Sequence, residues 1–68
     1  MFDNTSSIMN TREAATYLRL AVRTLEDLRL RGTGPKFARL GNGRSVRYRK
    51  ADLDAWVEAS LVTSTSAA

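Results

Sequence analysis

The chain has 68 residues, contains no cysteine and no histidine, and carries a formal net charge of +4. A chain of this length forms one domain at most and buries only about 60% of the surface that its unfolded form exposes, which disfavours an enclosed catalytic pocket. The missing residue types exclude disulfides, thiolate zinc sites and the side chains most often used as general base or metal ligand. We therefore expect no enzyme and no metal or cofactor site.

The net charge conceals an uneven distribution along the sequence. Residues 19–50 hold ten basic and two acidic side chains, a balance of +8, whereas residues 1–18 and 51–68 carry −1 and −3. Such a basic block favours a polyanionic partner such as nucleic acid, and a merely solvated surface is the less specific alternative. Only Lys36 and Lys50 are lysines, and arginine suits bidentate contacts to phosphate and guanine better than lysine does.

Both ends of the chain are predicted to lie outside the folded domain. Residues 1–8 are interpreted as a flexible arm, in which Ile8 is an apolar exception just before a helix. Residues 62–68 are small and polar and are interpreted as a disordered tail, which leaves residues 9–61 as the domain. No stretch approaches the roughly 18 apolar residues of a membrane helix, and no signal-peptide pattern is visible, so we expect a cytoplasmic protein.

Two short helices are predicted in the first half of the chain. The first covers about residues 11–18, with Asn10 or Thr11 as N-cap and Glu13 at capping-box spacing from Asn10. Its apolar face consists of Ala14, Ala15, Tyr17 and Leu18.

A tight turn at residues 19–21 leads to the second helix, predicted at about residues 22–31. Its buried stripe consists of Val22, Leu25 and Leu28, with Leu30 less clearly part of it. Gly32 is placed as the C-terminal glycine, and the proline of Thr33-Gly34-Pro35 prevents the helix from continuing.

Two strand-like runs follow, at residues 36–40 and 45–49. The intervening Gly41-Asn42-Gly43-Arg44 tolerates positive φ, which predicts a β-hairpin. Alternation gives apolar faces formed by Ala38 and Leu40 and by Val46 and Tyr48. The opposite faces carry Arg39, Arg47 and Arg49, which we expect to project to solvent. Phe37 interrupts the alternation and has no predicted place.

A third helix is predicted at about residues 50–60. Its apolar stripe consists of Leu53, Trp56, Val57 and Leu61. Trp56 is interpreted as the main core aromatic and not as a platform for stacking bases, because its stripe partners are aliphatic. Asp52 lies in the first turn, and Asp54 is spaced to pair with Lys50. Tyr17 and Tyr48 are expected to be half-buried, with their hydroxyl groups at the surface.

The predicted order is helix, tight turn, helix, hairpin, helix, which is a mainly α winged helix-turn-helix with a small β-hairpin. The stretch from Asn10 to Ala59 resembles the MerR-like winged helix-turn-helix domains of phage excisionases and AlpA-type regulators. The matching residues are Thr11-Arg12-Glu13-Ala14-Ala15-x-Tyr17-Leu18, Val22-Arg23-Thr24-Leu25, Gly32-Thr33-Gly34-Pro35, Arg39-Leu40-Gly41, Val46-Arg47-Tyr48-Arg49 and Asp52-Leu53-x-Ala55-Trp56. Each piece is short and common, so the resemblance depends on the ordered set.

One position departs from the pattern of that family. Its members usually carry serine or threonine just before the second helix, where this chain has Ala21. Alanine cannot cap through its side chain, a loss of about 0.5–2 kcal/mol at a typical N-cap. We therefore expect the second helix to fray more than in relatives unless Thr24 compensates.

The resemblance implies a double-stranded DNA-binding protein that lays its second helix in the major groove and its wing along an adjacent minor groove or the DNA backbone. It implies an excisionase (a recombination directionality factor) or a small phage or mobile-element transcriptional regulator. Expected partners are repeated DNA sites and, on DNA, an integrase or a second protomer. We expect a monomer in free solution, associated with the nucleoid when bound.

The second helix supplies the predicted base contacts, because the N-terminal residues of this helix face base edges in helix-turn-helix proteins. Arg23 is assigned to guanine, and Thr24 to a thymine methyl group or a phosphate. Glu26 and Asp27 lie on the same exposed face, and each has two interpretations, accepting a hydrogen bond from cytosine N4 or pairing within the helix. For Asp27 the helical partners at the right spacing are Arg23 and Arg31.

The wing and its flanks supply the predicted backbone contacts. Arg44 at the turn tip is assigned to a narrow minor groove, where the negative potential is enhanced. Phosphate contacts are assigned to Arg12, Tyr17, Arg19, Arg39, Arg47, Arg49 and Lys50. Two alternatives use the same basic surface, a protein-interaction module and an RNA-binding protein. RNA binding is disfavoured because Phe37 is the only plausible surface aromatic for base stacking.

Overall fold

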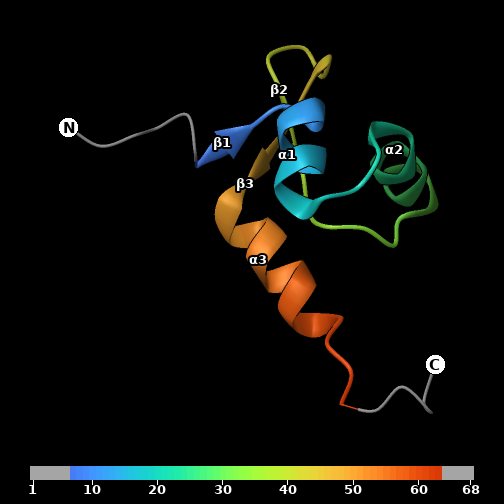
Figure 1. Cartoon of the computed structure of the whole chain (residues 1–68). Helices are drawn as coiled ribbons and strands as arrows, with labels where there is room; N and C mark the ends of the chain where they lie inside the picture. Colours follow the sequence, from blue (N-terminus) through green and yellow to red (C-terminus); the bar gives the residue numbers. More distant parts are fainter. Residues whose placement is uncertain (1–6, 64–68) are drawn as a thin grey trace.

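A computed structural model describes residues 7–63 as three helices and a small sheet (Figure 1). The helices are α1 (Thr11–Leu18), α2 (Val22–Arg31) and α3 (Lys50–Ala59), and the strands are β1 (Ile8–Met9), β2 (Ala38–Leu40) and β3 (Ser45–Arg49). The predicted fold class, a helix-turn-helix with a two-stranded wing and a third helix, is confirmed. Most of the predicted N-terminal arm and C-terminal tail lies outside the described residues.

Local capping determines where α1 begins. The Glu13 N–H donates to Asn10 Oδ1 at 2.8 Å, and the Asn10 N–H donates to Glu13 Oε1 at 2.9 Å, which completes the predicted capping box. The helix ends at Arg19, which adopts a left-handed conformation with φ of 61°. This residue therefore turns the chain sharply toward α2.

The boundaries of α2 also follow the predicted signals. Ala21 occupies the N-cap position in an extended conformation without a side-chain hydrogen bond, and Gly32 closes the helix with φ of 74°. The loop that follows packs closely on the helix, because a Cβ atom at Gly34 would lie 2.8 Å from Leu28 Cβ. Glycine is thus needed at position 34 to bring the loop against α2.

The sheet contains one strand that was not predicted. β1 pairs antiparallel with β3, which places Ile8 opposite Arg49 and Met9 opposite Tyr48, and the strand order is β1-β3-β2. Met9 is buried, whereas Ile8, which we expected to be the apolar residue before the first helix, is 46% exposed. Met9 therefore anchors this segment to the core. Two residues give too little alternation for a strand to be recognised from the sequence.

The wing is a hairpin of β2 and β3 whose first strand is shorter than predicted. Ala38 lies opposite Arg47 and Arg39 lies opposite Val46. Cross-strand partners share a face, so Arg39 lies on the side of Val46, and the apolar side chain of Ala38 shares the other face with Arg47. Arg39 is exposed as expected, although it shares the face of Val46, whereas Arg47 is half-buried and the expectation that it projects to solvent is wrong. Phe37 precedes β2 and packs against the core instead of entering the strand.

The core lies where α1, α2, α3 and β3 meet. Its buried residues are Met9, Ala14, Ala15, Leu25, Tyr48 and Leu53. Among the aromatic residues of 7–63, Tyr48 is the one that is fully buried, so the predictions of a central Trp56 and a half-buried Tyr48 are wrong. Trp56 is only partly buried, and its Nε1–H donates to the Thr33 carbonyl at 3.1 Å.

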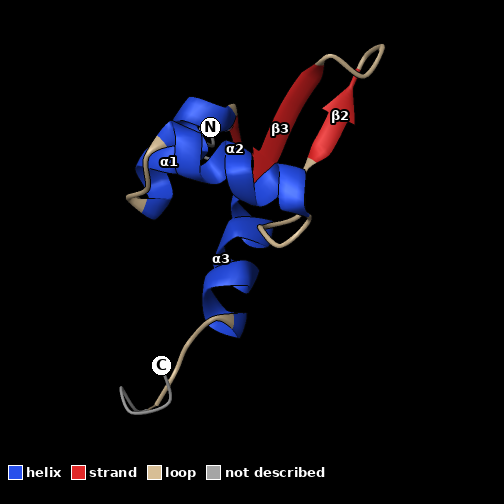
Figure 2. Cartoon of the chain, turned by 90° about the vertical axis from the view of Figure 1, so that its right-hand side faces the viewer, coloured by secondary structure: helices blue, strands red, loops and turns tan. Residues whose placement is uncertain are grey.

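The ends of two predicted apolar stripes are exposed. Val22, the first residue of α2, is 37% exposed, and Leu61 lies beyond the last turn of α3 and is 65% exposed. The wing and α3 extend in opposite directions from α1 and α2 (Figure 2), and most residues of the wing and of α3 are at least partly exposed. In residues 7–63, no helix is long and apolar enough to cross a membrane.

Candidate nucleic-acid interface

The tight turn and one half-buried arginine set the position of α2. Arg29 Nη1–H donates to Thr11 Oγ1 at 3.2 Å and to the Tyr48 hydroxyl at 3.3 Å, which ties α2 to α1 and β3. The guanidinium also lies 5.9 Å from the ring centroid of Phe37. Arg29 was counted in the basic block but assigned no role. Its position four residues after buried Leu25, on the same helix side, is the sequence signal that was overlooked.

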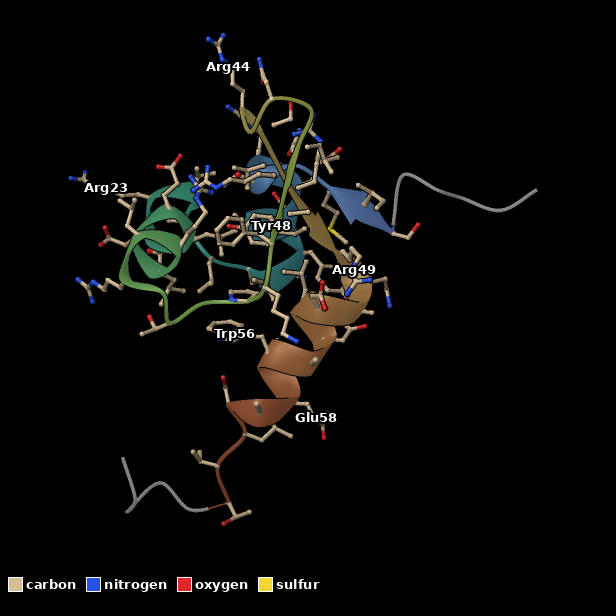
Figure 3. The ribbon with its side chains drawn as sticks, turned by 180° about the vertical axis from the view of Figure 1, so that it is seen from behind. Arg23, Arg44, Tyr48, Arg49, Trp56 and Glu58 are labelled. Carbon is tan, nitrogen blue, oxygen red and sulfur yellow. The ribbon has the colours of Figure 1, made fainter. Side chains whose placement is uncertain are left out.

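The opposite side of α2 carries the residues predicted to face DNA. Arg23, Thr24, Glu26 and Asp27 are all exposed. Asp27 forms an exposed ion pair with Arg31 at 3.8 Å, as one of its two interpretations proposed. Arg23 projects outward from the helix (Figure 3), and it has no hydrogen-bond or ion-pair partner among residues 7–63.

The wing presents its arginines in three different ways. Arg44 lies at the tip of the hairpin and points away from the body of the protein (Figure 3). Gly41 and Gly43 adopt positive φ values of 64° and 88°, which allow this tight turn. Arg39 lies 5.3 Å from the ring centroid of Phe37, and Arg47 is half-buried with Nη1–H donating to the Val46 carbonyl at 2.8 Å.

A third group of side chains joins the base of the wing to α3 and α1. Arg49 makes a bidentate contact with Asp52 through distances of 2.7 and 3.0 Å. Lys50 Nζ donates to Asp54 at 3.1 Å, as its spacing predicted, and the Tyr17 hydroxyl donates to Asp54 at 2.5 Å. We call these five residues the junction cluster.

The family of the chain follows from a comparison of its sequence with family patterns. Residues 8–60 match the helix-turn-helix domain family, and this range contains α1, the turn, α2 and the wing in the order described above. The chain belongs to this family. A comparison with curated proteins finds no match. Membership in the family implies binding to DNA.

The predicted contact residues of this helix-turn-helix domain fall into two groups. Those that are exposed and have no acidic partner among residues 7–63 are Arg12, Arg19, Arg23, Thr24, Arg39 and Arg44. Those with an intramolecular polar partner are Tyr17, Asp27, Arg47, Arg49 and Lys50. The second group is already engaged within the protein, so any contact of these side chains with DNA has to share or replace an existing hydrogen bond or ion pair.

Electrostatics reinforces this division in the junction cluster of the helix-turn-helix domain. The hydrogen bond from Arg49 lowers the pKa of Asp52, and the hydrogen bonds from Tyr17 and Lys50 lower the pKa of Asp54. Conversely, Asp52 raises the pKa of Arg49, and Asp54 raises the pKa of Lys50. All four side chains are therefore held in their charged forms, and the positive charges are largely balanced where they stand.

Proposed function

We propose that this protein binds double-stranded DNA sequence-specifically, with α2 in the major groove and the wing along the adjacent minor groove. The observation that carries the proposal is the arrangement of free arginines. Arg23 on α2 and Arg44 on the wing tip project from the end of the molecule that lies away from Glu58 on α3 (Figure 3). Unpaired positive charge is therefore found on α2 and at the wing tip, both away from Glu58 on α3, and this asymmetry orients the domain on a polyanion.

We assign base recognition to α2 and backbone contacts to the wing. Arg23 is suited to guanine, whose O6 and N7 atoms accept two hydrogen bonds from one guanidinium. Thr24 contacts a thymine methyl group or a phosphate. Arg44 enters the minor groove, and Arg39 and the flanking Arg12 and Arg19 approach phosphates. Arg47, Arg49, Lys50 and Tyr17 serve the domain's own structure first.

We further propose that the biological role is that of an excisionase or of a small phage or mobile-element regulator. This assignment depends on the resemblance of the Asn10–Ala59 pattern to those proteins. It implies repeated binding sites, a monomer in free solution, and association on DNA with a second protomer or with an integrase. Footprinting distinguishes the two roles. Protection of recombination attachment sites indicates excision, and protection of a promoter indicates transcriptional control.

The test of DNA binding is the salt dependence of affinity for a duplex. Each neutralised phosphate contributes about −0.9 to the slope of log affinity against log salt, so about five contacts give a steep slope. Fluorescence anisotropy with a labelled duplex measures this slope. A suitable range is about 50–200 mM salt, over which a protein with several phosphate contacts loses much of its affinity. A flat response overturns the proposal.

RNA binding is the alternative that the arrangement of aromatics disfavours. Phe37 packs near Tyr48, with ring centroids 6.1 Å apart, and the guanidinium groups of Arg29 and Arg39 lie 5.9 and 5.3 Å from its ring centroid. Its ring is thus engaged within the protein and is not a platform for an unpaired base. Competition of duplex DNA against single-stranded RNA tests this. A protein-interaction module would form a stable complex with another protein and would not retard duplex DNA at low salt.

A further inference from the structure

The recognition helix carries one acidic side chain that nothing balances. Glu26 is exposed on α2, and it has no hydrogen-bond or ion-pair partner among the residues that the structure describes. The other acid of this helix, Asp27, is paired with Arg31. Glu26 also stays apart from Arg23, although the two are three residues apart on one side of the helix.

A free carboxylate on a surface that meets DNA must be accounted for. Next to a phosphate it repels, and in the major groove it finds hydrogen-bond donors only on cytosine N4 and adenine N6. Adenine places the N7 acceptor beside its donor, which opposes a carboxylate that has only acceptors. Cytosine presents its donor without such a neighbour, and is therefore the better match.

We propose that Glu26 determines sequence specificity by accepting a hydrogen bond from cytosine N4, next to the guanine read by Arg23. The two side chains are complementary to a G·C pair or to adjacent G·C pairs, because guanine offers acceptors and cytosine offers a donor. Glu26 contributes little net affinity, since its charge opposes the approach of every DNA. It acts mainly by excluding sites without cytosine at that position. This inference rests on the proposed function.

The experiment is a selection of binding sites from randomised duplexes, performed in parallel with the wild-type chain, Glu26→Ala and Glu58→Ala. Glu58 is an exposed carboxylate on α3 with no partner in residues 7–63, so its removal changes the net charge equally but far from α2. We expect the wild-type consensus to contain a cytosine that becomes degenerate in Glu26→Ala and stays specified in Glu58→Ala. At that position, discrimination falls by about five- to 140-fold.

A second measurement tests whether the amino group at cytosine N4 is the donor to Glu26. N4-methylcytosine at the specified position removes the N4–H that faces the groove, so it should weaken binding by the wild-type chain and leave Glu26→Ala unaffected. Asp27→Asn serves as a further control and should retain the consensus. A consensus that survives Glu26→Ala, or that is lost instead in Asp27→Asn, overturns the role of Glu26 alone. A wild-type chain that selects no consensus contradicts the proposed function itself.

Discussion

Arg23 of α2 and Arg44 of the wing tip differ from the basic residues of the junction cluster, Arg49 and Lys50, because the cluster residues are paired with a carboxylate. Arg23 and Arg44 have no acidic partner among residues 7–63, whereas Arg49 and Lys50 are paired with Asp52 and Asp54 at distances of 2.7 and 3.1 Å. All four belong to the same basic block of the sequence. We infer that the pairing of each charge, and not the sum over a segment, is the better guide to which part of a basic block faces DNA.

Arg23→Ala is the substitution from which we expect the largest difference between the unpaired arginines and the paired basic residues of the junction cluster. The quantity affected is discrimination between base pairs. Loss of a bidentate contact to guanine should reduce discrimination at one base pair by about 1–3 kcal/mol. Anisotropy titrations with the selected site and with a duplex substituted at that position measure this difference.

Arg49→Ala is the matched control, because it removes the same side chain from a paired position. We expect it to leave discrimination unchanged. If Arg23→Ala instead lowers affinity equally for all sequences, Arg23 is a phosphate contact. If Arg49→Ala reduces affinity as strongly as Arg23→Ala, the distinction between free and paired arginines is wrong.

The sequence predicted the helices of this domain well because their boundary signals are local. The Asn10–Glu13 box, the exposed turn and Gly32 each act within a few residues, so spacing alone identifies them. β1 was missed because it is stabilised by pairing with β3, forty residues later in the chain. The central aromatic was misassigned for a similar reason, since Tyr48 is buried by elements that converge from distant parts of the sequence.

For the site, the sequence predicted the exposure of most basic residues, Arg47 excepted, but not which of them are engaged within the protein. The Lys50–Asp54 pair was predictable because helical neighbours four residues apart can meet. The Tyr17–Asp54 hydrogen bond spans 37 residues and was not, and neither was the contact of Arg29 with Tyr48. Long-range contacts of this kind depend on the packed fold and leave no periodic signal.

The next largest effect concerns the start of the recognition helix. Ala21→Ser adds a hydroxyl at an N-cap whose backbone is already extended, with φ of −69° and ψ of 147°. We expect stabilisation of about 0.5–2 kcal/mol, and in a domain of this size each kcal/mol raises Tm by about 4–8 °C. Thermal unfolding followed by circular dichroism checks this. Ala55→Ser, at an exposed position inside α3, is the control and should not stabilise. An unchanged Tm in Ala21→Ser would mean that α2 begins well without a cap.

A smaller effect distinguishes the wing tip from the base of the wing. Arg44→Ala should weaken binding to all sequences and reduce the magnitude of the salt slope by about 0.9 if it removes one phosphate contact. Arg49→Ala should leave the slope unchanged. Anisotropy titrations over a series of salt concentrations measure both variants under the same conditions. Equal changes in the two slopes would place the base of the wing on DNA as well.

The smallest expected effect tests the junction cluster itself. Contacts from Tyr17 and Lys50 lower the pKa of Asp54 in the folded protein. These contacts therefore stabilise the fold at pH values above the pKa that Asp54 has in the unfolded chain, about 4. That stabilisation is lost as the pH falls through the lower pKa of the folded state. Asp54→Asn should therefore have a lower Tm than the wild-type chain at pH 7, and the difference should shrink as the pH approaches 2, about two units below the unfolded value. Glu58→Gln removes a carboxylate without a partner in residues 7–63 and should show no such pH-dependent difference. A constant difference for Asp54→Asn across this range would mean that the amide disturbs packing and that the ion pair contributes nothing.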